Sequence, residues 1–81
     1  MGTLRVMNGR GDSRVSWSAR GLAEGDSAAE AAVREAERIF VHERERGGVA
    51  FRVQPGVLAE RIDTFDPLAE DTVLVPPMVG G

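Results

Sequence analysis

The residues with the most specific chemical meaning are the last six of the sequence, Pro76-Pro77-Met78-Val79-Gly80-Gly81. Glycine has no Cβ, so two consecutive glycines form a thread that can enter a narrow tunnel and bring a terminal carboxylate against a nucleotide phosphate. The rigid Pro76-Pro77 step should direct this thread clear of the folded body. The pattern predicts chemistry at the carboxylate of Gly81, with Gly80 beside it. The alternative is a frayed terminus without a role.

The composition excludes several kinds of covalent chemistry on side chains. All ten basic residues are arginine, and cysteine and tyrosine are absent. A chain without lysine or cysteine cannot form a Schiff base, a disulfide, a thiolate nucleophile or a thiolate-rich zinc site. It also offers no lysine for the attachment of further copies of itself. No catalytic constellation is present, so we expect that the protein is not an enzyme and binds no metal.

The length of 81 residues fits one small domain, which we place at residues 1–77, followed by a flexible tail over residues 78–81. The formal net charge of -3 argues against a nucleic-acid partner. No apolar run approaches the length that spans a bilayer, so no membrane partner is expected. The absence of cysteine and of a signal peptide favours a cytoplasmic location.

The first half of the sequence predicts a hairpin followed by a helix. Residues 3–8 and 13–18 alternate between apolar and polar side chains around a turn rich in glycine and aspartate, which is typical of a β-hairpin. Trp17 is expected to pack in the core or on the sheet surface, where it would anchor a partner if exposed. Residues 19–26 contain two glycines and are expected to form a connector.

An apolar stripe predicts a long helix over about residues 27–46. Its members recur three or four positions apart, at Ala29, Ala32, Val33, Ala36, Ile39 and Phe40. Ser27 and Glu30 have the spacing of a capping box, and Gly47-Gly48 is a stop. Elsewhere on the helix, arginines interleave with Glu35, Glu37, Glu43 and Glu45, which predicts a solvated, ion-paired face that includes His42.

The second half predicts strands. Residues 49–54 alternate, and Pro55-Gly56 suits the centre of a type II turn. Residues 58–65 are ambiguous, with a short strand near Ile62 and Phe65 under the Asp66-Pro67 turn. Val73-Leu74-Val75 is apolar on consecutive positions, which favours a strand buried on both faces, and Pro76-Pro77 ends it. The expected fold is an α+β roll whose last strand is central and parallel to the first.

This order of elements, ending in Val73-Leu74-Val75-Pro76-Pro77-Met78-Val79-Gly80-Gly81, resembles the ubiquitin-like β-grasp proteins. The ending is most similar to the small subunit of molybdopterin synthase and to archaeal ubiquitin-like small modifiers. The resemblance implies a β-grasp roll: a mixed sheet with an N-terminal hairpin, one long helix and a central C-terminal strand. It implies the function of a sulfur carrier or a protein modifier.

The resemblance also implies a mechanism. An ATP-dependent adenylating enzyme would activate the carboxylate of Gly81, and sulfur or an enzyme thiol would then capture the acyl group. Gly81 would end as a thiocarboxylate or in an amide bond to a lysine of a target protein. The partner would supply ATP and magnesium, so this chain would hold no cofactor. Met78 and Val79 would lie in the partner's channel, while Pro76 and Pro77 set the exit angle.

Two features do not fit this reading fully. Ala69-Glu70-Asp71-Thr72 stands where the molybdopterin synthase subunit usually has a turn rich in glycine and aspartate, so the pterin role is the less supported one. Gly9-Arg10-Gly11-Asp12-Ser13 looks like the adhesion peptide that integrins recognise, although glycine, aspartate and serine are also what a turn requires. A non-covalent β-grasp interaction module, binding through its sheet face or edge, remains the alternative function.

Overall fold

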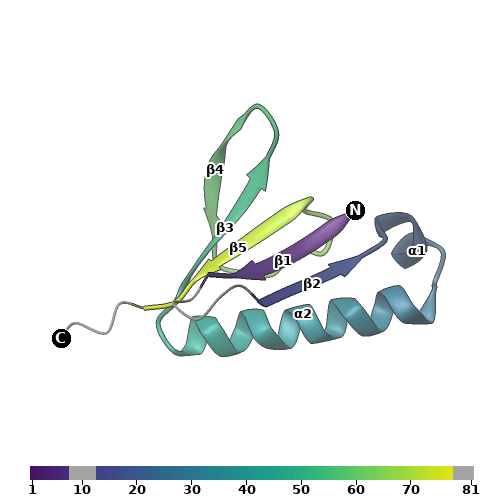
Figure 1. The fold of residues 1–81 in the computed structure, drawn as a ribbon, viewed down its shortest axis with the longest axis horizontal. Coiled ribbons are helices and arrows are strands. Elements are labelled where there is room, and N and C mark those ends of the chain that lie inside the picture. The colour runs from purple at the N-terminus through teal and green to yellow at the C-terminus, as the bar shows by residue number, and fades with distance from the viewer. Residues whose placement is uncertain (8–12, 78–81) are drawn as a thin grey trace.

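The computed structural model describes residues 1–7 and 13–77, and the statements below concern those residues. They form an α+β fold in which one long helix lies across one face of a mixed five-stranded sheet (Figure 1). The predicted class and order of elements are confirmed. The elements are β1 (Gly2–Val6), β2 (Ser13–Trp17), α1 (Ala19–Ala23), α2 (Ser27–Glu45), β3 (Val49–Gln54), β4 (Val57–Ile62) and β5 (Asp71–Val75).

The strand order in the sheet is β2-β1-β5-β3-β4, so the last strand of the chain is the central one. It runs parallel to β1, with Val6 opposite Leu74, and antiparallel to β3, with Ala50 opposite Leu74. β1 and β2 form the predicted antiparallel hairpin. The long crossover through α2 permits the parallel pairing, as expected, because a tight turn cannot join parallel strands.

The capping box predicted at Ser27 and Glu30 is wrong. Asp26 is the N-cap of α2, and its carboxylate accepts a hydrogen bond from the backbone N–H of Ala28 at 3.2 Å. Aspartate is as good an N-cap as serine, so the residue one position earlier takes this role and Ser27 becomes the first helical residue. At the other end, Arg46 caps the helix and Gly47 adopts a φ of +93°, which confirms the predicted stop.

The segment expected to be a connector contains the short helix α1. Ser18 caps it by accepting a hydrogen bond from the backbone N–H of Gly21 at 2.9 Å. Gly21 is buried, and a Cβ there would lie 3.1 Å from the Asp26 carboxylate. The glycine therefore lets α1 pack closely against the start of α2, and it does not mark a loop.

The core lies between the sheet and α2, and the connection between β4 and β5 closes one side of it. Trp17 is buried rather than an exposed anchor, and its indole N–H donates to the carbonyl of Pro67 at 3.1 Å. The Phe65 ring lies 5.9 Å from the Trp17 ring and 5.7 Å from the Phe40 ring, measured between centroids. Phe65 is partly buried, and the buried members of the core besides Trp17 and Phe40 are Leu4, Val6, Ala36, Ala50 and Leu74.

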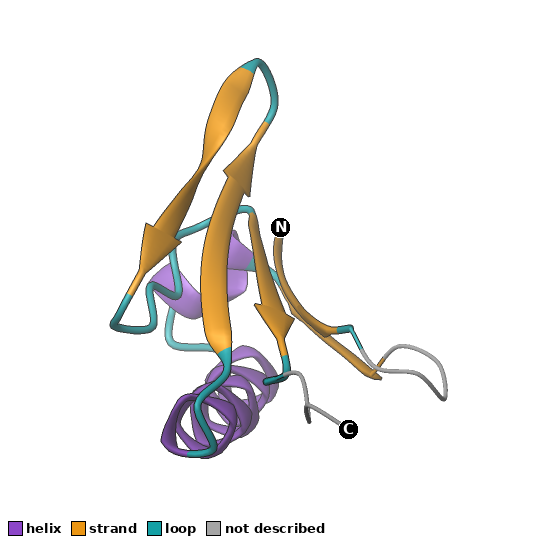
Figure 2. Cartoon of the chain, turned by 90° about the vertical axis from the view of Figure 1, so that its left-hand side faces the viewer, coloured by secondary structure: helices purple, strands orange, loops and turns teal. Residues whose placement is uncertain are grey.

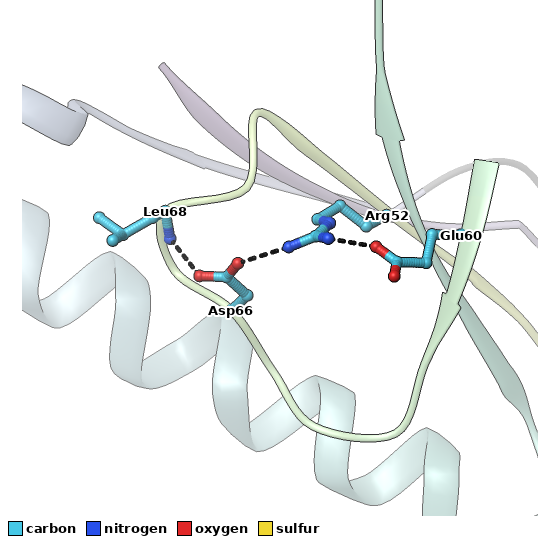
Figure 3. Close-up of polar contacts among 4 residues, drawn as sticks. All are labelled: Arg52, Glu60, Asp66 and Leu68. Carbon is cyan, nitrogen blue, oxygen red and sulfur yellow. Dashed lines mark hydrogen bonds and ion pairs between the residues drawn. The ribbon is translucent and has the colours of Figure 1, made fainter. Parts of the chain in front are cut away.

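The β3–β4 hairpin rises away from the helix beyond the other strands (Figure 2). Gly56 has a φ of +73°, as a type II turn requires, which agrees with the predicted Pro55-Gly56 turn. The ambiguous segment after it is a strand, β4. Arg52 in β3 fixes the base of this hairpin, because its guanidinium donates to the carboxylates of both Glu60 and Asp66 (Figure 3).

Only one face of the sheet is covered in the described part of the chain. Along β5, Thr72 and Leu74 have no exposed surface, whereas Val73 is half-buried and Val75 is 40 % exposed. The prediction that this strand is buried on both faces is therefore wrong for one face. No second layer follows in the described residues, so the side chains opposite the helix form an open surface.

Candidate functional site

The structure describes only the base of the predicted site. Pro76 and Pro77 follow β5 and are half-buried, whereas Met78, Val79, Gly80 and Gly81 lie outside the described residues. The Gly9-Arg10-Gly11-Asp12 turn also lies outside them. What can be built from the described residues is the exit of β5 and the sheet face beside it.

The exit lies at the end of the central strand. The last pairs of the β5 ladder join Val75 to Val49 on one side, and the N–H of Met7 to the carbonyl of Leu74 at 2.9 Å on the other. Pro76 and Pro77 have no backbone N–H and cannot extend the ladder, so pairing stops at this point. The chain therefore leaves the sheet between two neighbouring strands rather than from an edge.

The turn after α2 packs directly against this exit. No pattern in the sequence predicts this contact. A Cβ on Gly48 would lie 2.8 Å from the carbonyl oxygen of Glu43 and 3.1 Å from that of Val75. A Cβ on Gly47 would lie 3.8 Å from the Cβ of Pro77. Gly47-Gly48 is therefore more than a helix stop, because glycine at Gly48 allows the helix end and the strand end to approach each other.

The burial of Glu43 contradicts the prediction that this residue belongs to a solvated face of α2. Glu43 is 8 % exposed, and one carboxylate oxygen lies 3.3 Å from the Arg46 guanidinium. The other oxygen is buried without a hydrogen-bond partner among the described residues. The neighbouring Arg44 donates to the carbonyl of Gly48 at 2.9 Å and to Asp63 at 3.0 Å. These contacts fix the helix end beside the exit.

The other predicted members of this helix face are exposed as expected, except the half-buried Arg44, but Glu37 and Glu45 do not form the predicted ion pairs with other described residues. His42 is exposed, and Arg38 holds the carboxylate of Glu35 through two hydrogen bonds of 2.5 and 3.1 Å. These bonds lower the pKa of Glu35 below its ordinary value and raise that of Arg38. Within residues 1–7 and 13–77, no three histidine or acidic side chains are grouped so that they could hold a metal ion.

The open face of the sheet carries one row of side chains across all five strands. The registers place Arg14 of β2 beside Arg5 of β1, Arg5 beside Val73, Val73 beside Phe51, and Phe51 beside Arg61 of β4. Alternation within each strand predicts which residues share a face, but it does not supply the register. This row was therefore hidden in the sequence.

In the middle of the open face, apolar side chains of β3 and β5 lie beside the ion pair of Arg5 and Asp71, and arginines stand at its two ends. Val49 and Val75 pair in the next row beyond Phe51 and Val73, and Met7, which follows β1, is 45 % exposed. Arg5 is bound to Asp71, with Nη2 2.7 Å and Nε 3.3 Å from the two carboxylate oxygens. Arg14 and Arg61 form no ion pair with another described residue. This face can bind an apolar surface flanked by carboxylates.

Among the described residues, the exit itself is built from prolines, glycines, valines and backbone carbonyls. Neither helix of the described part is long and apolar enough to cross a membrane. No protein-family model, no curated protein and no solved structure matches this chain.

Proposed function

We propose that this chain is a ubiquitin-like β-grasp protein that acts as a sulfur carrier or as a small protein modifier. The single observation that carries the proposal is the position of β5. It is the central strand, it is parallel to β1, and Pro76-Pro77 ends its ladder next to the helix end at Gly48. The strand that precedes the reacting end is paired on both sides, which supports the proposal because a partner enzyme must position the carboxylate relative to the folded body.

The proposed first step is the same for both roles. The carboxylate of Gly81 attacks the α-phosphorus of ATP on an adenylating enzyme, which forms an acyl-adenylate and releases pyrophosphate. A sulfur nucleophile then displaces AMP. Sulfide-level sulfur from a donor gives a thiocarboxylate, whereas an enzyme cysteine gives a thioester, from which a lysine amine of a target protein takes the acyl group. The partner supplies ATP, magnesium and all catalytic side chains.

The adenylation step is tested by ATP–pyrophosphate exchange with a purified adenylating enzyme of the ubiquitin-activating class. We expect exchange that depends on the full chain and is lost when Gly80-Gly81 is deleted or when one alanine is added after Gly81. Arg20→Gln, an exposed change on α1, should leave the exchange rate unchanged. Exchange that persists in both the shortened and the extended chain would show that the Gly80-Gly81 end is not required, and it would overturn the proposed reaction at the Gly81 carboxylate.

The two roles are then separated by the products. A carrier should show an intact mass raised by one oxygen-to-sulfur exchange after incubation with ATP and sulfide. A modifier should appear in larger conjugates whose tryptic peptides carry a remnant of its tail on lysine. Because the chain contains no lysine, each acceptor lysine should receive one copy, without lysine-linked chains of this protein.

The alternative function, a non-covalent interaction module, has an observation of its own. The open face presents Phe51 and Val73 between two arginines, and no described element covers it. Under this function, binding to a partner should survive deletion of residues 78–81 and fall when Phe51 is changed to serine. Under the carrier or modifier function, deletion of residues 78–81 should abolish ATP–pyrophosphate exchange, whether or not Phe51 is changed.

A further inference from the structure

Two surfaces on opposite sides of the molecule carry matching patterns of opposite charge. The first is the open-face row, defined as Arg14, Arg5, Val73, Phe51 and Arg61. Since Arg5 is neutralised by Asp71, the row presents an arginine at each end and apolar side chains between them. The pattern across the sheet is therefore basic, apolar, basic.

The second surface is the α2 stripe, defined as Glu37, Val41 and Glu45. These residues are four positions apart, and all three border one shallow hollow on the outer side of the helix. Val41, between the two glutamates, is 48 % exposed. Neither Glu37 nor Glu45 forms an ion pair with a described residue, so the pattern along the helix is acidic, apolar, acidic.

The distance between the two arginines of the row differs from the distance between the two glutamates of the stripe by less than the length of the two arginine side chains. Arg14 and Arg61 are four strands apart, which is about 19 Å between their Cα atoms at a strand spacing of about 4.8 Å. Glu37 and Glu45 are eight residues apart, which is about 12 Å along a helix. The long arginine side chains can close this difference while their stems cover the apolar surface between them.

We propose that the α2 stripe of one copy of this chain docks on the open-face row of a second copy. The charges select this arrangement over the symmetric ones. Two stacked open faces would oppose arginine with arginine, and two paired helices would bring together faces on which Glu37 and Glu45 alternate with Arg34 and Arg38. The helix of one copy on the sheet of another opposes Glu37 and Glu45 to Arg14 and Arg61, and it covers Val41, Val73 and Phe51.

The contact joins two different surfaces, so it is heterologous and repeats. A docked pair still has one free row and one free stripe, and further copies therefore add until a ring closes or a filament forms. Arg34, Arg38 and His42 also border the hollow beside Glu37 and Glu45. Arg38 is paired with Glu35, and Arg34 offsets part of the negative charge. The association is accordingly weak and falls with salt.

Sedimentation equilibrium of the full chain over a concentration series tests the proposal. In low salt, the average mass should exceed that of the monomer and rise with concentration, and high salt should return it towards the monomer. If the chain stays monomeric at every concentration in low salt, the proposal is overturned. The open-face row would then be a binding surface for an acidic region of another protein.

Two neutral double variants identify the surfaces. The variant Arg14→Gln with Arg61→Gln removes the two end charges of the open-face row. The variant Glu37→Gln with Glu45→Gln removes the two end charges of the α2 stripe. Each variant alone lacks one of the two docking surfaces and should stay monomeric. Mixed in equal amounts, they should form dimers and nothing larger, because the mixture retains one intact row and one intact stripe per pair. Variants that assemble like the unchanged chain would overturn the proposal.

Charge reversal separates this contact from a general effect of charge. Arg14→Glu with Arg61→Glu should abolish assembly, and adding Glu37→Arg with Glu45→Arg to the same chain should restore it. The matched control, Arg20→Gln with Glu24→Gln, changes an exposed ion pair on α1 and should assemble normally. Loss of assembly in this control, or no recovery in the fourfold reversed chain, would contradict the proposed contact.

Discussion

The indole ring of Trp17 lies directly against the backbone of Gly2, its opposite residue in the β1–β2 hairpin. A Cβ on Gly2 would lie 2.3 Å from both Nε1 and Cε2 of the ring, closer than two such atoms can approach. The ring is 3 % exposed and is held on its other side by its hydrogen bond to Pro67. Gly2 is therefore required by packing and not by backbone conformation.

The contact predicts the effect of Gly2→Ala. The added methyl group must displace a ring that has no free space, so we expect the free energy of unfolding to fall by about 1–3 kcal/mol, as for other overpacked cores. Denaturant unfolding followed by Trp17 fluorescence measures the change. Ser16→Ala, at an exposed position of the same hairpin, should have little effect. Equal stabilities of the two variants would mean that the ring moves aside freely.

Much of the fold could be predicted because local periodicity records the burial of each side chain. The stripe of Ala36 and Phe40 on α2 does face the core, and the alternation of Leu4 and Val6 does mark β1. The central position of β5 followed from an apolar run closed by prolines. These features depend on which side chains are buried, and the sequence carries that information directly.

The remaining features depend on geometry that no local pattern contains. Asp26 and Ser27 are equally suitable caps, and only the path of the chain selects between them. A continuous apolar run such as Val73-Leu74-Val75 is the same whether one face is covered or two. The burial of Glu43 follows from the close approach of Gly48 to Val75, which joins residues distant in sequence. The open-face row could not be predicted for the same reason, because the strand register joins residues that are distant in sequence.

Thr72 predicts a substitution that should increase stability. This residue has no exposed surface, and its hydroxyl has no hydrogen-bond partner among the described residues. Valine has the same shape without the hydroxyl, so Thr72→Val should raise the free energy of unfolding by about 1 kcal/mol. Thr72→Ser retains the hydroxyl and removes a methyl group, so it should destabilise the protein. If both variants are less stable than the unchanged chain, the hydroxyl has a partner in solution.

The contact between Glu35 and Arg38 predicts a pH-dependent contribution to stability. The hydrogen bonds from Arg38 lower the pKa of Glu35 in the folded protein. The contribution is therefore present above the pKa of the unfolded chain and is lost as the pH falls through the lower folded value. NMR titration of the Glu35 carboxyl group should show its pKa rising in Arg38→Gln and staying low in Arg34→Gln. The same low pKa in both variants would exclude Arg38 as the cause.

The guanidinium of Arg52 ties β4, through Glu60, to the β4–β5 connection, through Asp66 (Figure 3). Asp66 also accepts the backbone N–H of Leu68 at 2.9 Å, so one carboxylate fixes both the connection and its internal turn. Arg52→Met keeps much of the stem and removes the charge. We expect it to loosen the connection that carries Phe65 and Pro67 while the α2 helix stays protected.

Amide hydrogen exchange measures this local effect. In Arg52→Met, the N–H of Ala69 and the indole N–H of Trp17 should exchange faster, because the first bonds to the carbonyl of Asp66 and the second to that of Pro67. Arg20→Met removes an exposed ion pair on α1 and should leave both rates unchanged. Faster exchange across the whole molecule would show that Arg52 supports global stability instead. Unchanged rates would show that the packing of Phe65 and Trp17 holds the connection without the ion pairs of Arg52.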